Sequence, residues 1–456
     1  MNTNAPTTSV SVSSRRQRNI IVVSSMVGST LEYYEFFVYG TMAALAFGHL
    51  FFPSDDPTAG TLASFVTFAV GFVARPIGSL LAGHFGDKLG RKGTLATTLL
   101  AMGIATVLIG VLPTAEQVGI LAPVLLVVLR LVQGLALGGE WGGAALMLVE
   151  SVPANRRGRM GSLVNLGVPA GLLLASGVTS LSVAISGDSF LVWGWRLPFL
   201  ASAVLVAVAL VFRFAVSESP AFVQAEAMQA EAPKAPIGQV FRDHWRDLLL
   251  SLGIGAPANA LFFLVSTFTT SYAVNDLHIA QGEVLGAQAA AAAVYVVTIP
   301  FFGALADRIA GWRVVLLGAV ACAVFIPLYF VLLDTGDVLA VFAAMAIGMA
   351  VIHAALQAPQ ASVLSSRFPT RVRYTGVAFA QTLPTTIVGG TVPYLATLFV
   401  GMTGNTVLVV GYVVVLSLIG IGCATAFGRS PRRWDTEDAR ATDSDVTAER
   451  ARRAPR

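Results

Sequence analysis

The residues best able to do chemistry are charged side chains that interrupt long apolar segments. The first segment contains Glu32, Glu35 and Tyr39, which share one helical face. An ionisable group at bilayer depth costs at least about 2.5–3.5 kcal/mol on insertion scales, so each one needs a partner or a function. A buried carboxyl group can bind and release a proton, because burial favours its neutral form and an approaching arginine favours its charged form.

Two arginines lie within the following apolar segments, Arg75 in the second and Arg130 in the fourth. Gln133 and Glu140 are predicted to lie on the same helical face of the fourth segment as Arg130. Arg130 and Glu140 would be about 15 Å apart along a helix axis, so they cannot pair directly. A guanidinium at this depth can hold the carboxylate of an anionic solute or tune a neighbouring acid. The structural alternative is a static buried ion pair, such as Arg75 with a glutamate.

The second half of the chain has fewer charges in its apolar segments. His353, Gln357 and Gln360 share one face of the tenth segment, Asn259 lies in the seventh and Gln381 in the eleventh. We expect these residues to line a cavity with hydrogen-bonding groups. Polar contact between helices is an equally good account of Asn259 and Gln381. His353 fits a satisfied core histidine as well as a proton carrier.

A short loop between the second and third segments, residues 83–92, combines three glycines, three cations and Asp87. Asp87 can cap the following helix or pair with Arg91. The plain alternative is a charged turn that only sets topology. A second copy, with Asp307 and Arg308, follows at an offset of 220 residues, which indicates an internal duplication of the kind found in many transporters.

The composition predicts a membrane protein with many spans. The 456 residues are 55% hydrophobic and only 12% charged, whereas soluble domains are about a quarter charged. The net charge of +4 is spread over short loops and indicates no nucleic-acid partner. Cys322 and Cys423 lie in apolar segments, so we expect core residues there and no disulfide or metal site.

Twelve apolar segments are long enough to span a bilayer. They cover residues 20–47, 60–86, 93–113, 119–149, 159–183, 193–215, 247–274, 283–306, 313–333, 337–365, 373–400 and 404–428. Alternate loops carry lysine and arginine, whereas the loops between them carry neither. This asymmetry predicts that both termini are cytoplasmic in a multi-pass protein of the inner (cytoplasmic) membrane.

The loop at 216–246 divides the segments six and six. We therefore expect a cytoplasmic tail (1–18), a first bundle (19–215), a linker with a short surface helix (216–246), a second bundle (247–428) and a disordered tail (429–456). A second repeat supports the two halves: Glu150 and Arg157 close the fourth segment, and Ser366 and Arg373 close the tenth, at an offset of 216.

Over residues 19–428 the sequence resembles the major facilitator superfamily, and within it the metabolite:proton symporter family. The motifs concerned are residues 31–36, 72–78, 83–92, 130–134, 138–140, 194–199, 218–220 and 368–376. The resemblance implies an all-α membrane protein with twelve transmembrane helices in two six-helix bundles. The resemblance also implies proton coupling. Physical reasoning from the residues alone does not distinguish a proton from a sodium ion.

The sequence departs from the family pattern at several positions. Glu35 stands where the family usually has Asp. In the second loop copy, Ala310, Gly311 and Trp312 replace Gly-Arg-Arg, and Ser366 replaces the acid that Glu150 supplies in the first half. We therefore expect a weaker latch in the second half. The tail lacks the coiled coil of some osmosensing members, and this absence argues against an osmoregulatory role.

These observations predict a secondary transporter that moves a small organic metabolite inward with a proton. Organic acids such as dicarboxylates, keto acids or shikimate-like hydroxy acids are favoured, because two arginines lie at membrane depth. Alternatives are a zwitterionic osmolyte such as proline or betaine and, third, an efflux antiporter. No repeated channel filter, cluster of catalytic residues or ATP motif occurs, so we expect no cofactor and a gradient as the energy source. We expect a functional monomer.

The site residues fall into three predicted groups. Proton coupling is assigned to Glu35, Glu32 and Glu140. Substrate binding is assigned to Arg75, Arg130, Gln133, Tyr39, Asn259 and Gln357. The resemblance assigns a cytoplasmic gate to Gly83, Asp87, Gly90, Arg91, Glu150, Arg157, Asp307 and Arg308.

Overall fold

The computed structural model describes residues 15–89, 91–138, 140–150, 152, 154–215, 236–368 and 373–429, and every regular element in these ranges is a helix. The first half contains α1 (Arg15–Leu45), α2 (Phe47–Phe51), α3 (Pro57–Leu89), α4 (Arg91–Gly110), α5 (Ala115–Val118), α6 (Leu121–Leu137), α7 (Glu140–Glu150), α8 (Arg157–Val164), α9 (Gly167–Ser186) and α10 (Leu197–Ala215). The second half contains α12 (Pro236–Asp243), α13 (Trp245–Phe263), α14 (Thr269–Asn275), α15 (Gln281–Ile309), α16 (Gly311–Leu333), α17 (Val338–Ala346), α18 (Ala354–Gln357), α19 (Gln360–Ser365), α20 (Arg373–Pro384), α21 (Val392–Thr403) and α22 (Val407–Arg429).

The helices account for the twelve predicted spans. Nine stretches within the described ranges are long and apolar enough to cross a membrane. The shorter apolar helices at 96–110 and 121–137 and the 31-residue α1 complete the set. α1 is interrupted by the charged residues Glu32 and Glu35, which explains why its composition alone does not single it out. The all-α fold with twelve transmembrane helices is confirmed.

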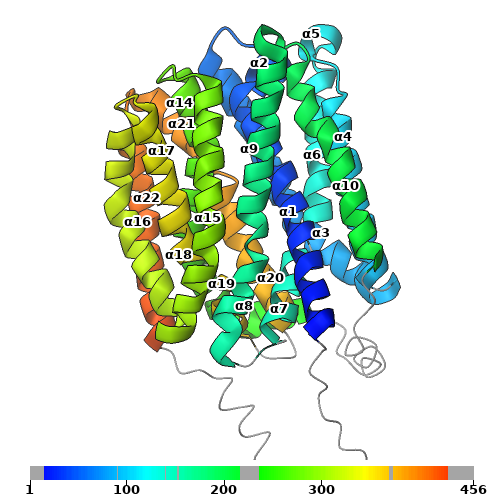
Figure 1. The fold of residues 1–456 in the computed structure, drawn as a ribbon, viewed down its shortest axis with the longest axis vertical. Helices are drawn as coiled ribbons and strands as arrows, with labels where there is room; N and C mark the ends of the chain where they lie inside the picture. The colour runs from blue at the N-terminus through cyan, green and yellow to red at the C-terminus, as the bar shows by residue number, and fades with distance from the viewer. Residues whose placement is uncertain are drawn as a thin grey trace, which may run out of the picture.

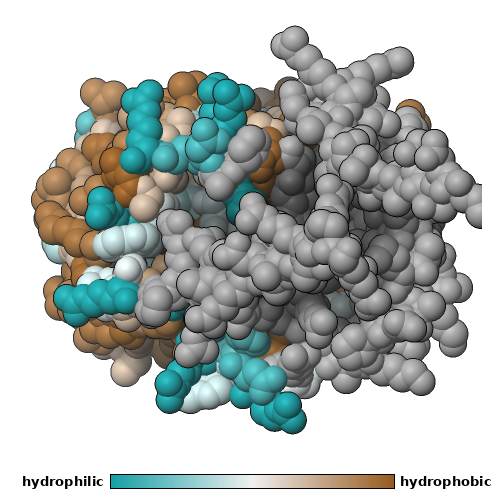
Figure 2. Space-filling view, turned by 90° about the horizontal axis from the view of Figure 1, so that it is seen from below, coloured by the Kyte–Doolittle hydropathy of each residue, from teal (hydrophilic) through white to brown (hydrophobic). Residues whose placement is uncertain are grey.

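The two halves lie side by side, with α9 of the first half packed against α15 of the second (Figure 1). α1 begins and α22 ends at the same end of the molecule, together with α7, α8, α19 and α20. We call this the basic end, because it carries the cations of the interhelical turns, such as Arg156, Arg308 and Arg367. Seen from there, the described surface has hydrophilic patches facing the viewer and hydrophobic residues on its flank (Figure 2).

Close glycine contacts bring α3 and α6 together. A Cβ atom on Gly134 would lie 2.2 Å from the Gly71 carbonyl oxygen, and one on Gly78 would lie 2.1 Å from the Leu135 carbonyl oxygen. Neither position can accept a side chain without moving a backbone, which is how small residues pack membrane helices. This packing fixes the two helices that carry Arg75 and Arg130.

Several helix boundaries differ from the prediction. The expected loop at 83–92 is almost entirely helical: α3 continues to Leu89 and α4 begins at Arg91, because membrane helices extend beyond the apolar core. The fourth segment is divided instead, since α6 ends at Leu137 and α7 begins at Glu140, so Arg130 and Glu140 do not share one helix. α1 begins at Arg15, before the predicted start, and α13 begins at Trp245. The expected surface helix at 221–231 lies outside the described residues.

Three π-helical segments interrupt the second half, η5 (Leu264–Phe268), η6 (Ile347–His353) and η7 (Thr385–Gly389). π-helical turns inside α-helices are rare and often occur at functional sites. η6 ends at His353 and η7 begins at Thr385, and both of these residues face the space between the halves.

Candidate functional site

A cavity lies between the two halves. Its first-half wall comes from α1, α3, α6, α7 and α9 and includes the charged residues Glu32 and Arg75. Its second-half wall comes from α13, α18, α20 and the π-helical segments η6 and η7. The polar residues on that wall are neutral: Asn259, His353, Gln357, Gln381, Thr382 and Thr385. The cavity therefore offers one cation and one anion on one side and hydrogen-bonding groups on the other.

Glu32 and Arg75 form a loose ion pair at the cavity wall. Arg75 Nη2 lies 3.7 Å from Glu32 Oε1, and both side chains are mostly buried. The guanidinium also lies 5.1 Å from the ring of Phe72 and 5.6 Å from the ring of Phe36, within cation–π range. A carboxylate that enters the cavity can compete with Glu32 for this guanidinium.

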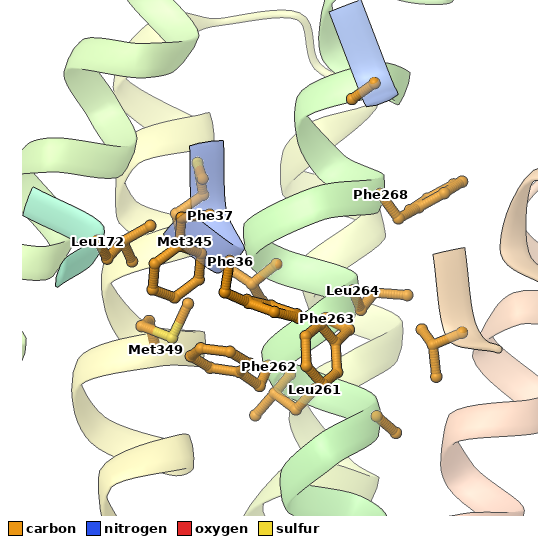
Figure 3. Close-up of a cluster of buried hydrophobic side chains, with 14 of the residues drawn as sticks. Phe36, Phe37, Leu172, Leu261, Phe262, Phe263, Leu264, Phe268, Met345 and Met349 are labelled. Atoms are coloured by element: carbon orange, nitrogen blue, oxygen red, sulfur yellow. The ribbon is translucent and has the colours of Figure 1, made fainter. Parts of the chain in front are cut away.

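Aromatic rings pack across the interface between the halves at the end of the cavity away from the basic end, where Phe36, Phe262 and Phe263 line the cavity. Phe36 of α1 lies 5.1 Å from Phe263 of α13, and Phe37 lies 5.3 Å from Phe262, measured between ring centroids. Phe72 of α3 also contacts Phe263, at 5.3 Å. Figure 3 shows the α1 and α13 side chains converging, with Met345 and Met349 nearby. We call these five phenylalanines the aromatic plug.

Glu35 lies in a separate buried network behind Phe36. Thr106 of α4 donates a hydrogen bond of 2.6 Å to Glu35 Oε2 and accepts one of 2.7 Å from Gln133 Nε2. Arg130 Nη1 donates to Gln133 Oε1 at 3.2 Å, and its guanidinium lies 4.1 Å from the Tyr39 ring. Tyr39 in turn donates to Thr67 Oγ1.

This network leaves Glu35 well placed to hold a proton. Its side chain is 2% exposed, and Oε1 has no hydrogen-bond partner among the described residues. Arg130 Nε also lacks one, and the described side chains include no ion pair between Arg130 and Glu35. A buried carboxylate without a cation is costly, whereas a protonated carboxyl group is not. The arrangement therefore fits a proton-binding group that is kept away from the cavity.

The predicted substrate residues divide between these two places. Arg75, Asn259 and Gln357 line the cavity, as does Glu32. Arg130, Gln133 and Tyr39 do not line it and lie instead around Glu35. In sequence they appeared to belong with Arg75, because helical periodicity gives the face of each helix but not its neighbours.

Hydrogen bonds across the halves hold the second-half wall in place. Asn165 Nδ2 of the first half donates to the Gln357 carbonyl oxygen at 3.1 Å, and Gln357 Nε2 lies 3.5 Å from Asn165 Oδ1. The Tyr295 hydroxyl lies 2.5 Å from His353 Nδ1. Asn259 Nδ2 donates to the Gly255 carbonyl oxygen. Asn165, Tyr295 and Thr106 were not predicted, because an isolated polar residue in an apolar helix gives no pattern.

At the basic end, Asp307 binds the start of α8 in the other half. Its Oδ1 accepts from the Gly158 amide at 2.6 Å and its Oδ2 from the Arg159 amide at 2.9 Å. A carboxylate at a helix N-terminus is favourable because the free amides and the helix dipole both attract negative charge. Nearby, Gly142 of α7 lies against Ala378 of α20. Contacts between the halves therefore exist on both sides of the cavity.

The other predicted gate residues are placed only in part. Arg157 and Arg308 are exposed at the basic end. The backbones of Gly83 and Asp87 belong to the last turns of α3, Arg91 begins α4, and Glu140 and Glu150 bound α7. The side chains of these residues, and Gly90 altogether, lie outside the described part of the chain. Their predicted roles remain predictions.

Two halves of membrane-spanning helices with a cavity between them are the arrangement expected of a membrane transporter. The chain belongs to the Major Facilitator Superfamily, whose family model matches residues 25–385. The inner membrane metabolite transport protein YhjE of Escherichia coli (strain K12) is 40% identical over 385 residues, which cover 83% of this chain and 87% of that protein. The protein is therefore a membrane transporter of metabolites and not an enzyme.

Two further relatives differ in their named solutes. The shikimate transporter of Escherichia coli (strain K12) is 37% identical over 378 residues, covering 82% of this chain and 86% of that protein. The proline/betaine transporter of the same strain is 34% identical over 410 residues, covering 88% and 81%. Among solved structures, the xylose transporter XylE from E. coli shares the fold, with a TM-score of 0.69 at 18% identity over 92% of this chain and 99% of that one.

Proposed function

We propose that the protein is a proton-coupled symporter that moves a small organic acid inward across the cytoplasmic membrane by alternating access. The observation that supports this most is the separation of two buried acids on one helix. Glu32 pairs with Arg75 at the cavity, while Glu35 is enclosed three residues further on without a cation partner among the described side chains. The first can respond to a solute and the second can hold the coupling proton.

The roles follow from the charges. The carboxylate of the solute binds the Arg75 guanidinium and displaces Glu32 from it. Glu35 binds a proton from the outer side and releases it to the cytoplasm, and Thr106 and Gln133 orient it. Glu140 stays a further candidate for the proton because of its position at the start of α7. Rocking of the halves opens either the aromatic plug or the contacts at the basic end.

Within the organic acids, the cavity favours a monocarboxylate. The sequence favoured dicarboxylates, keto acids and shikimate-like hydroxy acids alike, because two arginines lie at membrane depth. Arg130 is stacked on Tyr39 behind Phe36, so Arg75 is the single arginine among the described lining residues. A single guanidinium, which already faces Glu32, can pair with a solute that has one carboxylate better than with a solute that has two or three. The shikimate transporter among the relatives agrees with such a solute.

A zwitterionic osmolyte is the second candidate. Glu32 beside Arg75 can bind an ammonium and a carboxylate together, and the rings of Tyr33, Phe36 and Phe262 line the same cavity. Aromatic rings attract quaternary ammonium groups. The proline/betaine transporter among the relatives fits this alternative.

The basic end is proposed to face the cytoplasm, with both termini there, because positively charged loops are retained inside. We also propose that the monomer is the transporting unit, since the cavity is enclosed by one chain. Protons, the solute and the lipid bilayer are then its partners, and the proton gradient replaces any cofactor.

Uptake into proteoliposomes tests the proposal. Labelled α-ketoglutarate, citrate, shikimate, proline and betaine are offered to the purified full-length protein with and without an inside-alkaline pH gradient. We expect gradient-driven accumulation of a monocarboxylate, which Glu35→Gln and Arg75→Ala abolish and the exposed control Glu116→Gln leaves intact. Accumulation of betaine or proline alone moves the assignment to osmolytes. Transport that ignores the pH gradient contradicts symport.

A further inference from the structure

The second-half wall contains two polar groups that the proposed function does not use. We propose that His353 and Gln381 recognise a hydroxyl group of the solute, and that Tyr295 is the positioning residue that fixes His353 as a hydrogen-bond donor. This inference rests on the proposed function, because it assumes that the cavity is the solute site. It narrows the solute to a monocarboxylate with a hydroxyl group away from the carboxylate.

The contacts of His353 determine which ring nitrogen can donate. Tyr295 and His353 are both buried, and the Tyr295 hydroxyl has His353 Nδ1 as its partner at 2.5 Å. A tyrosine hydroxyl with one partner, which is a ring nitrogen, is satisfied when it donates to that nitrogen. A neutral imidazole that accepts at Nδ1 carries its proton on Nε2. Tyr295 therefore leaves His353 with an N–H donor on the other side of the ring.

That donor is available to the cavity. His353 lines the cavity, and its ring is held against the Phe262 ring with 4.9 Å between centroids. No described residue accepts a hydrogen bond from Nε2. Two neighbours on the same wall have backbone partners for their donors: Asn259 Nδ2 donates to the Gly255 carbonyl oxygen, and Thr385 Oγ1 donates to the Gln381 carbonyl oxygen. His353 is thus a donor held in a fixed direction.

Gln381 supplies the complementary acceptor. Its side-chain oxygen Oε1 is buried and has no hydrogen-bond partner among the described residues, although Gln381 lines the cavity. Buried polar atoms almost always have partners, so this one needs a reason. A hydroxyl group on the solute accepts from His353 and donates to Gln381, which satisfies both groups at once. A carboxylate can only accept, and the quaternary ammonium of betaine can do neither.

Matched solutes test this recognition directly. Binding of shikimate and of its analogue without hydroxyl groups, 1-cyclohexene-1-carboxylate, is measured by titration calorimetry on the purified full-length protein. The two share the carboxylate that Arg75 would bind. We expect wild-type protein to prefer shikimate by about 10- to 100-fold, which is the range for leaving buried polar partners unpaired.

The variants separate recognition from packing. His353→Leu and Gln381→Leu should weaken shikimate binding by about 10-fold or more and leave the analogue unchanged, since only a hydrogen bond is lost. His353→Gln should retain the preference, because its amide keeps an N–H donor. Tyr295→Phe should lower the preference in part. The matched control is Tyr329→Phe, which removes an equally buried hydroxyl bonded to Thr269 at 2.6 Å, away from the cavity.

The outcomes are distinguishable. An unchanged preference in both leucine variants overturns the inference, and so does a loss in Tyr329→Phe equal to that in Tyr295→Phe. Gradient-driven betaine uptake without shikimate binding overturns the inference while the symport proposal stands. If no solute accumulates in the wild-type liposomes, the proposed function itself fails. Should His353→Leu not fold, Gln381→Leu and Tyr295→Phe decide the matter.

Discussion

Removal of the Asp307 carboxylate should open the basic end of the transporter. Asp307 belongs to α15 in the second half and accepts two backbone hydrogen bonds from the first turn of α8 in the first half, at 2.6 and 2.9 Å. These bonds exist only while the halves are closed at this end. Their loss therefore destabilises the inward-closed state relative to the inward-open one.

The size of the shift follows from the two bonds. Hydrogen bonds to a charged group contribute about 1.5–3 kcal/mol each when buried, and the helix dipole adds about 0.3–1 kcal/mol. Asp307 is only half-buried, so we take about 2–4 kcal/mol for Asp307→Ala. This corresponds to about a 30- to 700-fold change in the equilibrium between the two states. Asp307→Asn keeps one carbonyl oxygen and should lose about half of the free energy, or about 5- to 30-fold.

Cysteine labelling measures this equilibrium. Thr382→Cys in a variant without Cys322 and Cys423 places a reporter in the cavity, and an impermeant maleimide is added to inside-out vesicles. The labelling rate should rise in the order wild type, Asp307→Asn, Asp307→Ala. The matched control is Asp337→Ala, which removes the N-cap of α17, a bond of 3.1 Å to the Ala340 amide within one half. Equal labelling in Asp307→Ala and Asp337→Ala would refute the latch.

Three other substitutions test the proton site and the packing. Glu35→Gln should abolish pH-driven accumulation but preserve counterflow of solute at equal pH, because only proton release is lost; retained accumulation excludes Glu35 as the carrier. Ala310→Gly should raise the free energy of unfolding by about 0.5–1 kcal/mol, since Ala310 has a φ of 74° that favours glycine. The melting temperature should therefore rise, and a lower one contradicts this prediction. Gly134→Ala should lower the yield of folded protein in size-exclusion chromatography, because its Cβ would lie 2.2 Å from the Gly71 carbonyl oxygen, whereas Gly177→Ala, with nothing within 4 Å, should not.

Much of the fold was predictable because the sequence features that indicate it occur many times along the chain. Spanning length and alternating loop charge predict the twelve helices and a common side for the termini, and the duplicated motif around Asp87 and Asp307 predicts the two halves. Arg75 opposite a glutamate was also foreseeable, since a charge at that depth needs a partner. The helical continuity from Gly83 to Leu89 was not, because the charged residues there are as compatible with a helix end as with a loop.

The division of the charged residues into two places was beyond the sequence. Periodicity places Arg130 and Gln133 on one face of α6, but it does not say whether that face meets the cavity or the Glu35 side of α1. The answer depends on the rotation of packed helices, which close glycine contacts such as Gly134 on Gly71 determine. Thr106 and Asn165 became visible only with their partners in place.

The contact made by Asp307 does not depend on the motif residues that the second half lacks. The replacement of Gly-Arg-Arg by Ala310, Gly311 and Trp312 led us to expect a weak contact. Asp307 instead binds backbone amides, which every residue except proline supplies, so substitutions among the neighbouring side chains leave its partners intact. The acid absent at Ser366 has a counterpart in space, because Asp247 of α13 lies 3.1 Å from Arg367.

In the proposed mechanism, α1 couples solute binding to proton release. α1 carries Glu32 at the cavity and Glu35 in the enclosed network, and the Phe36 ring contacts both Arg75 and Arg130, 5.6 and 5.8 Å from their guanidinium carbons. A solute that displaces Glu32 from Arg75 acts on the same helical turn that holds Glu35 against Thr106. We propose that a rotation of α1 that follows the solute breaks the 2.6 Å hydrogen bond that Thr106 donates to Glu35. Solute binding and proton release can therefore be linked through α1 without direct contact between the two acids.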